Sequence, residues 1–282
     1  MRFSSFLLVL AVSIQAHASF LRLVPTIRFG NLSAESGKLE LAGTVVNQGD
    51  EQAFDVKIES VRTGTLVADL GTMNMSENKD VSVSLGLADF GISGPGYYQV
   101  PMRVLYRDGN RAGFSAIFIL DYVYKKDADS AKASPVLIAL DESIRESGRL
   151  DISRRGELGF SLRNTSGDKQ SITVEVVGSK ELNFVPPKQT VELGSQEEKV
   201  LQIEVENKQG LPGSSYAGYA IVSGTTGGQV FSEYAGFVVG LVAGYSPNWS
   251  TGLLIALIVV FAFFGYAQWR KSVKTGDTDE DA

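Results

Sequence analysis

The sequence has no cysteine, and its one histidine is His17. The rest of the chain therefore lacks thiol nucleophiles, histidine general bases and Cys/His zinc sites. Without disulfides, an extracytoplasmic protein must be held together by core packing, which is more typical of bacteria and archaea than of small secreted animal domains. Carboxylates are then the only acid–base candidates that remain.

Positive charge is also in short supply. The chain has 26 lysines and arginines against 32 aspartates and glutamates, a formal charge of −6 at neutral pH. Because no basic surplus is available to neutralise phosphates, we predict no nucleic-acid partner.

The acidic residues lie in predicted turns or at solvent-facing positions, as in Asp50-Glu51 and Glu197-Glu198. No loop has the ligand spacing of a calcium site, and no glycine-rich turn is followed by a helix that would hold a phosphate. We therefore predict that the protein is not an enzyme and has no catalytic residue, metal site or cofactor. A hydrolase with two carboxylates converging across a cleft stays open as an alternative, because a sequence cannot show that convergence.

The N-terminus has the three parts of a signal peptide. Arg2 gives a positive start, an apolar run extends from Phe6 to Ile14, and Ala16-His17-Ala18 forms an A-x-A cleavage site. The apolar run is too short to span a bilayer. We predict a signal peptide over residues 1–18, with a buried N-terminal strand or helix as the alternative; no cysteine follows, which excludes a lipoprotein anchor.

The C-terminal region contains an uncharged stretch from Thr251 to Trp269. At helical rise this stretch spans roughly 28 Å, close to the thickness of the hydrocarbon core of a membrane. We predict a transmembrane helix over residues 249–269, since a buried core helix would not be apolar on every face. Its predicted interface anchors are Tyr245, Trp249, Tyr266, Trp269, Arg270 and Lys271.

Basic residues follow this stretch and none stands just before it, so the positive-inside rule gives the orientation. We predict a single-pass protein of the cytoplasmic membrane. Its N-terminal region is expected to be extracytoplasmic, either periplasmic or at the cell surface. The tail over residues 270–282 is expected to be cytoplasmic, as a solvated stub or a docking tail.

Between the two ends, apolar and polar residues alternate with a period of two, which places one face of a strand on a core and the other in water. Polar turn segments rich in glycine, asparagine and aspartate separate these strands, and no amphipathic helix of any length is found. The fold class is therefore predicted to be all-β, with β-sandwiches. The clearest alternating segments are Phe54 to Glu59, Asp80 to Leu85 and Ile172 to Val176.

The same landmarks occur twice in the same order. A strand that ends in Asn47 or Asn164 is followed by a polar turn and a new strand, and the two asparagines are 117 positions apart, as are Pro95 and Pro212. This repeat predicts two tandem immunoglobulin-like β-sandwich domains. We expect them over residues 19–126 and 135–244, with a polar linker over residues 127–134.

Each copy resembles the start of the bacterial and archaeal immunoglobulin-like modules called CARDB and NEW3. Those modules combine a strand–Asn–Gly turn–strand pattern with a later polar turn and a late PGxY strand. The resemblance covers most of residues 37 to 240 and implies a fold and an accessory or adhesive role, without naming a ligand. Matching positions are Val45, Asn47, Gly49, Ala53 and Val56 in the first copy, and Leu162, Asn164, Val174, Glu197 and Val200 in the second.

Tyrosines gather on the late strands of both copies, where they either fill the core or form a binding face. Tyr98 and Tyr106 share the strand face of Val100, so we expect them in the core. Tyr97 shares its face with Arg103, and these two are the candidate surface-binding residues.

We predict a membrane-anchored, extracytoplasmic protein-interaction or adhesion module, a non-enzymatic subunit of an envelope complex with an envelope or membrane protein as partner. The second domain runs almost directly into the predicted helix, which favours a partner in or near the same membrane. Two alternatives stay open: a module that binds cell-wall glycan through surface aromatics, and a periplasmic assembly chaperone with an exposed sheet edge.

Overall fold

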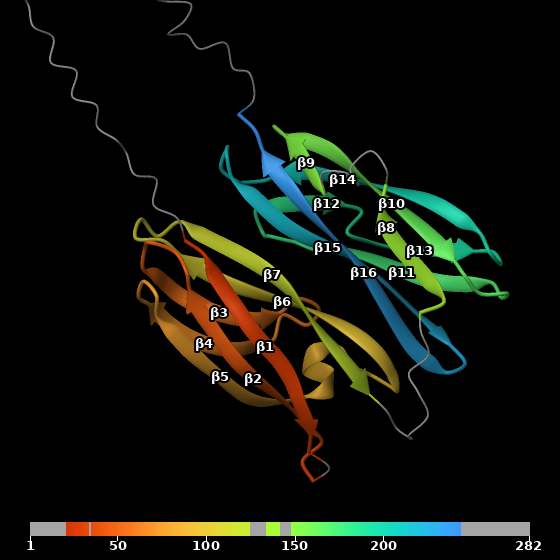
Figure 1. Cartoon of the computed structure of the whole chain (residues 1–282), viewed down its shortest axis with the longest axis horizontal. Helices are drawn as coiled ribbons and strands as arrows, with labels where there is room; N and C mark the ends of the chain where they lie inside the picture. The colour runs from red at the N-terminus through yellow and green to blue at the C-terminus, as the bar shows by residue number, and fades with distance from the viewer. Residues whose placement is uncertain (1–20, 34, 125–133, 142–147, 244–282) are drawn as a thin grey trace, which may run out of the picture. The chain divides into compact units, whose positions relative to one another are not determined.

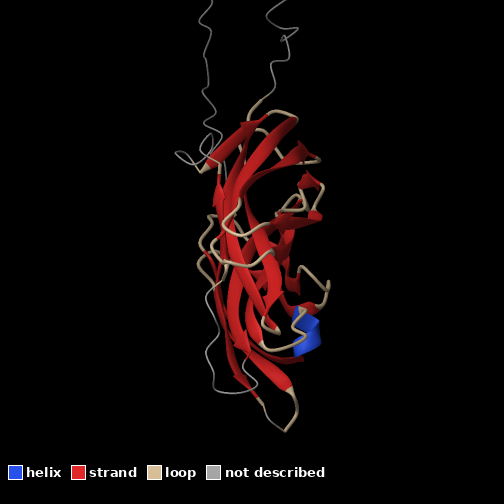
Figure 2. Ribbon diagram, turned by 90° about the vertical axis from the view of Figure 1, so that its right-hand side faces the viewer, coloured by secondary structure: helices blue, strands red, loops and turns tan. Residues whose placement is uncertain are grey.

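The computed structural model describes residues 21–33, 35–124, 134–141 and 148–243. In this part of the chain the fold is all-β, as predicted, and the one helical element is a single 3₁₀ turn, η1 (Leu87–Phe90) (Figure 2). The strands are β1 (Leu23–Leu32), β2 (Lys38–Asn47), β3 (Ala53–Ser60), β4 (Leu66–Met73), β5 (Asn78–Gly86), β6 (Gly96–Arg107), β7 (Gly113–Tyr124), β8 (Val136–Leu140), β9 (Arg149–Ile152), β10 (Arg155–Asn164), β11 (Gln170–Gly178), β12 (Leu182–Val185), β13 (Lys188–Leu193), β14 (Glu198–Asn207), β15 (Ser215–Thr226) and β16 (Gln229–Leu241).

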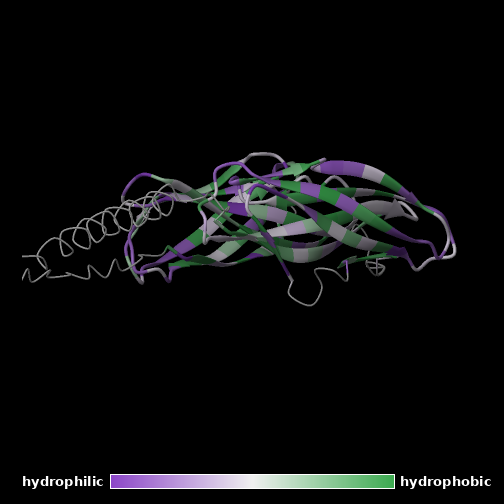
Figure 3. Ribbon diagram, turned by 90° about the horizontal axis from the view of Figure 1, so that it is seen from above, coloured by the Kyte–Doolittle hydropathy of each residue, from purple (hydrophilic) through white to green (hydrophobic). Residues whose placement is uncertain are grey.

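The predicted alternation sets the faces of the strands. Val56 and Ile58 on β3 are fully buried, whereas Asp55, which directly precedes Val56, is exposed. Ile172, Val174 and Val176 likewise point into a core. Apolar and polar residues alternate along the ribbons in the same way (Figure 3).

The first sandwich packs a sheet of order β1-β2-β5 against β4, β3, β6 and β7. Its core joins both sheets, since Leu41 of β2, Ile58 of β3 and Val104 of β6 belong to one buried cluster. Burial of such side chains contributes most of the stability of a disulfide-free domain.

The second sandwich packs a sheet of order β12-β14-β10-β8 against β13, β11, β15 and β16. Phe160 and Phe237, from opposite sheets, meet edge to face with ring centroids 5.9 Å apart. In each sandwich one sheet holds strands A, B and E of the immunoglobulin fold and the other holds C, F and G. The corresponding strands are β1, β2, β5, β3, β6 and β7 in the first sandwich and β8, β10, β14, β11, β15 and β16 in the second.

The repeated asparagines fix the same turn in both sandwiches. Asn47, fully buried at the end of β2, donates from Nδ2 to the carbonyls of Glu51 at 2.7 Å and Asn74 at 3.1 Å. Its Oδ1 accepts a bond of 3.0 Å from the backbone N–H of Gly49. The side chain therefore ties two loops to the end of the strand and satisfies their buried backbone groups.

Asn164 repeats this arrangement at the end of β10. Its Nδ2 donates to the carbonyls of Asp168 at 2.8 Å and Gly194 at 2.6 Å, and its Oδ1 accepts from the N–H of Ser166 at 2.9 Å. Turn chemistry, and not a binding role, accounts for both asparagines.

A tyrosine near the start of strand F closes the preceding loop in each sandwich. The hydroxyl of Tyr98 donates to the carbonyl of Gly94 at 2.7 Å, and that of Tyr216 accepts from the N–H of Leu211 at 3.2 Å. This is the tyrosine corner of immunoglobulin-like sandwiches. It makes Tyr216 the structural counterpart of Tyr98.

Several predictions from the sequence fall on residues outside the described part. These are the signal peptide over 1–18, most of the linker over 127–134, the helix over 249–269 with its interface anchors Tyr245, Trp249, Tyr266, Trp269, Arg270 and Lys271, and the tail over 270–282. Among the residues that the structure describes, no helix is long and apolar enough to cross a membrane. The described residues up to Val242 form one compact unit that contains both cores, so the predicted domain limits stay predictions.

The role of the buried asparagines can be measured. Asn47→Ala leaves several loop carbonyls and an N–H without a partner, and we expect it to lower the free energy of unfolding by about 2 kcal/mol in urea titrations. Asn183→Ala is the matched control, because Asn183 is exposed and its side chain donates to the carboxylate of Glu206. A loss for Asn47→Ala no larger than that of the control would contradict this account.

Candidate functional site

The two sandwiches bury parts of their outer sheet faces against each other (Figure 1). Ile117 of β7, Val177 of β11 and Ile221 of β15 form a small apolar cluster at this contact, with Val61, Ile119 and Tyr219 packed around it. One parallel bridge, Val230 with Gly96, joins the sheets of the two sandwiches. A Cβ at Gly96 would lie about 2.2 Å from the carbonyl oxygen of Val230, so the close approach requires glycine.

Ion pairs surround the apolar cluster. Arg103 Nη1 lies 2.9 Å from Glu59 Oε1, and Lys180 Nζ from the other sandwich lies 3.4 Å from the same oxygen. Arg62 Nε and Glu175 Oε2 form a second bridge across the contact at 3.2 Å. Both carboxylates are largely shielded from water, so removing one member of a pair would leave a partly buried charge without its partner.

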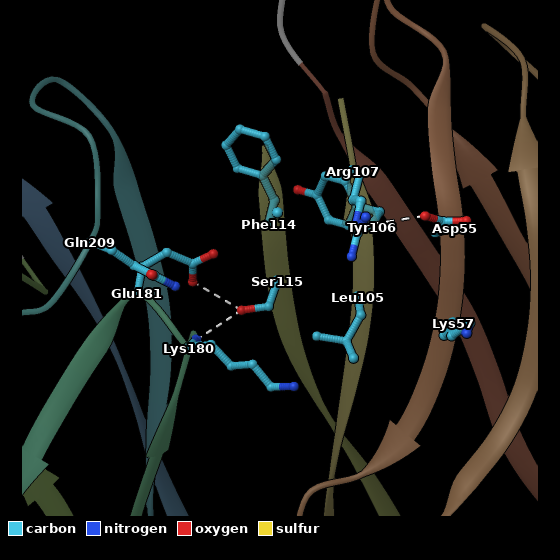
Figure 4. A pocket seen from close by; sticks show the side chains of 11 residues that line it. Asp55, Lys57, Leu105, Tyr106, Arg107, Phe114, Ser115, Lys180, Glu181 and Gln209 are labelled. Atoms are coloured by element: carbon cyan, nitrogen blue, oxygen red, sulfur yellow. Dashed lines mark hydrogen bonds and ion pairs between the residues drawn. The ribbon is translucent and has the colours of Figure 1, made fainter. Parts of the chain in front are cut away.

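A groove opens where the two faces separate (Figure 4). Its volume is about 340 Å³. The wall from the first sandwich comes from β3, β6 and the start of β7, including Lys57 and Arg107, and the opposite wall includes Lys180 and Glu181 from the loop between β11 and β12. The groove therefore exists only because both sandwiches contribute to it.

Ser115 connects the two walls. Its hydroxyl donates to Glu181 Oε2 at 3.0 Å and accepts from the backbone N–H of Lys180 at 2.9 Å. Its carbonyl accepts from the hydroxyl of Ser179 at 3.0 Å. Glu181 is only 4% exposed, so the bond from the Ser115 hydroxyl offsets part of the cost of burying this carboxylate.

Strand β3 carries a bulge at the rim of the groove. Asp55 has a φ of +52°, a conformation that aspartate tolerates better than most residues. The register shifts across Asp55 in the pairing of β3 with β4 and also in its pairing with β6, which marks the bulge. The carboxylate is thereby placed 3.6 Å from Arg107 Nε, and bulges commonly redirect side chains in this way.

A second cavity of about 670 Å³ continues the groove past Tyr106, Phe114 and Ser115, which line both. The rings of Tyr106 and Phe114 stack with centroids 5.8 Å apart. Burial, with a contribution from Glu181, raises the pKa of Tyr106 to about 12, so its hydroxyl stays protonated as a hydrogen-bond donor. The floor is thus aromatic and the walls are charged.

This arrangement suits binding. Among the described residues, no group of three or more histidine, cysteine, aspartate or glutamate side chains could hold a metal ion. In the groove, Glu181 is engaged by Ser115 and Asp55 by Arg107. A mixed aromatic and charged groove at the junction of two domains is a common form of ligand site.

The two residues predicted from the strand pattern have different positions. The hydroxyl of Tyr97 donates to Asp121 Oδ1 at 2.8 Å and accepts from Gln99 Nε2 at 3.3 Å, on the outer face of β6. Tyr98, on the opposite face, is buried as predicted.

Arg103 lies in the contact between the sandwiches. Its side chain is 15% exposed, pairs with Glu59 and donates from Nη2 to the carbonyl of Gly178 at 3.3 Å. Period-two reasoning placed it on the outer face, but it could not show that the second sandwich covers that face. Tyr97 and Arg103 therefore do not form one exposed patch, and surface binding at Tyr97 stays a prediction.

The residues that build the groove were not found from the sequence. Ser115 is 65 positions from Lys180 and 66 from Glu181, and none of the three stands in a motif. The one available signal was indirect. The continuous apolar run Ala116-Ile117-Phe118-Ile119-Leu120 predicts a strand buried on both faces, which requires something to cover the outer face of β7.

Comparisons with known proteins give structural likeness alone. No family model matches the chain, and no curated protein matches it. The chain is similar to native alpha-2-macroglobulin of Escherichia coli, crystallised from domain MG7 to the C-terminus, with 21% identity over 39% of this chain and 17% of that one, at a TM-score of 0.33. A cryo-EM reconstruction of the same E. coli protein gives 12% identity over 80% of this chain and 17% of that one, at 0.32.

A protein of unknown function from Porphyromonas gingivalis W83 is 16% identical over 78% of this chain and 99% of that chain, at a TM-score of 0.30. The chain thus spans about a sixth of the macroglobulin chains that it matches. TM-scores this low carry no argument about function, and the resemblance to CARDB and NEW3 modules stays a prediction.

The pKa of Glu233 provides a test of the charge interactions around Tyr97. Burial, the largest cause, and the charge of Asp121 raise the pKa of Glu233 above its usual 4.5. The folded protein therefore disfavours the ionised form. This penalty is absent below the unfolded pKa, develops as the pH rises from the unfolded to the folded pKa, and is complete above the folded one. We expect Glu233→Gln to raise the melting temperature at pH 7.5 and to have a much smaller effect at pH 4.

An NMR titration of the Glu233 carboxyl is the direct check, because Asp121→Asn should lower its pKa. A melting-temperature change for Glu233→Gln that is equal at both pH values would contradict the electrostatic origin.

Proposed function

We propose that the protein is a non-enzymatic interaction module in which two tandem immunoglobulin-like domains are held outside the cytoplasmic membrane by a helix over residues 249–269. Its partner is an envelope or membrane protein, and the groove between the sandwiches is the binding site. The signal-peptide pattern and the uncharged C-terminal stretch support the location. The resemblance to CARDB and NEW3 modules supports an accessory role.

The observation that carries this proposal is the composition of the groove. Lys57, Arg107 and Lys180 line it beside the stacked rings of Tyr106 and Phe114. Their ion-pair partners lie at 3.4 to 3.6 Å, and each of the three cationic side chains is 44–54% exposed, so the charges can exchange partners on binding. Protein interfaces combine buried aromatic anchors with arginine in this way.

A glycan is the second candidate ligand, because aromatic rings can also stack on sugars. In this groove, however, Tyr106 and Phe114 stack on each other, and Tyr97 uses its hydroxyl within the chain. The charged walls match a protein partner better than a neutral sugar.

In-cell crosslinking of the full-length protein, followed by purification and mass spectrometry, tests the location and the partner class. The control is a chain that lacks residues 251–269. We expect one or two envelope or membrane proteins to be recovered with the full-length chain alone, because the helix holds both partners in one membrane. Equal recovery with both forms, or recovery of cell-wall glycan only, would contradict the proposal.

Charge reversal in the groove tests the site. We expect Arg107→Glu to reduce recovery of the crosslinked partner at least about fivefold, since a reversed charge opposes a complementary surface. Arg155→Glu is the matched control: Arg155 is an exposed arginine that also pairs with carboxylates, and it lies on β10 away from the groove. Similar losses for both variants would show that the groove is not the site, without excluding a partner elsewhere on the protein.

A further inference from the structure

Among the described residues, strand G has an extra partner in the second sandwich but not in the first. In the second sandwich, the end of β16 pairs with β15 on one side and with the short parallel strand β9 on the other. In the first sandwich, β7 pairs with β6, and no other described strand pairs with it. The same position on the fold is therefore filled in one copy and open, among the described residues, in the other.

The tyrosine corners give the residue-by-residue correspondence. Tyr216 lies opposite Val239 of β16, and Tyr98 lies opposite Tyr122 of β7. Because Tyr98 and Tyr216 are counterparts, Asp121 corresponds to Val238 and Val123 corresponds to Gly240. The segment of β16 that receives β9 is therefore equivalent to residues 121–124 of β7.

Strand β9 shows how a chain occupies this position. The N–H of Val238 donates to the carbonyl of Gly148 at 3.0 Å, and the N–H of Val242 donates to the carbonyl of Ile152 at 2.9 Å. Ile152 is buried in the core, whereas the side chains of Arg149 and Asp151 pass over Gly240 on the other face. Alternate residues of the added strand thus meet the core and the outer face.

The backbone of β7 is oriented to accept such a strand. The carbonyl of Ser115 bonds to Ser179 of the second sandwich and therefore points away from β6. In an antiparallel ladder the direction alternates, so the N–H groups of Asp121 and Val123 also point away from β6, whereas that of Tyr122 points toward it. The counterparts on β16 give the same result independently. The N–H of Val238, which corresponds to Asp121, points toward β9 and away from β15.

The side chains beside this edge specify the partner. Val123 is 42% exposed, and the carboxylate of Asp121 accepts from Tyr97. Charge interactions couple Asp121 to Glu233. An apolar residue facing Val123 and a basic residue near the two carboxylates would complement the edge.

We propose that residues 121–124 of β7 form a docking edge for an extended segment of a partner polypeptide, which adds as a parallel strand in the position that β9 takes on β16 and carries a basic side chain toward Asp121. The inference is independent of the groove. It also does not depend on membrane anchoring.

Disulfide capture on the full chain in detergent tests the docking edge, because the chain has no cysteine of its own. The probe is a synthetic peptide of residues 148–155, which contains β9 and three arginines. The peptide carries Asp151→Cys as a mixed disulfide with thionitrobenzoate, and the protein carries Val123→Cys. In register, the protein thiolate attacks the peptide sulfur and releases thionitrobenzoate, whose absorbance gives the rate. We expect exchange at least about tenfold faster than with a Leu150→Cys peptide, whose thiol faces the core.

Two control variants separate the contributions. Leu66→Cys, at an exposed position of β4, should react equally with both peptides. Val123→Pro removes one outward N–H and should abolish binding of a cysteine-free peptide, measured by fluorescence anisotropy, whereas Val123→Thr keeps the N–H and should retain it. Residue-resolved hydrogen exchange should show new protection at Asp121 and Val123 with the peptide and no change at Tyr122.

Equal exchange rates for the two peptides at Val123→Cys would overturn the proposal. Protection of the Asp121 and Val123 amides in the peptide-free full chain would also overturn it, because the chain would then cover this edge itself. Failure of the crosslinking or groove experiments would leave these results unaffected.

Discussion

The groove exists because two sheets bury faces that an isolated sandwich would leave in water. An antiparallel sheet commonly packs one face on its core and solvates the other, which gives the alternation seen along β3 and β11. At Ile117, Val177 and Ile221 that alternation is broken, and the apolar side chains on the outer faces pack against each other. This contact brings the two walls of the groove together. It also places Arg103 and Ser115 next to their hydrogen-bond partners in the second sandwich.

The contact between the sandwiches combines a small apolar cluster with many polar side chains. Gln99 Oε1, Arg103 Nε and Ser232 Oγ are buried without a hydrogen-bond partner within the described chain, and each such atom costs on the order of 1–3 kcal/mol. The ion pairs of Glu59 and Glu175 offset part of this cost but also carry their own desolvation. The contact therefore depends on the geometry of a few charged side chains.

Much of the fold could be predicted from the sequence, because the period-two pattern and the turn residues are local signals. Asn47 and Asn164 end strands as expected, and the turn at residues 226–228 joins two paired strands. The groove could not be predicted, since its residues come together only through packing between the sandwiches. Arg103 illustrates the limit: its strand face was predicted, but the residue pairs within the chain instead of facing solvent. The binding role predicted for Tyr97 lies beyond what strand parity can decide.

Two sandwiches with the same strand order can differ at their edges. Once both copies have the same strand order, a short insertion such as β9 can close strand G in one copy without altering the other. In the first copy, Tyr122 and Tyr124 are only partly buried where Val239 and Leu241 are fully buried in the second, and Phe29 packs edge to face on Tyr122. These rings pack against the first core at the position that β9 fills in the second sandwich, so side chains cover the core there in place of an added strand. An edge that its own core does not require can keep its backbone groups for another chain.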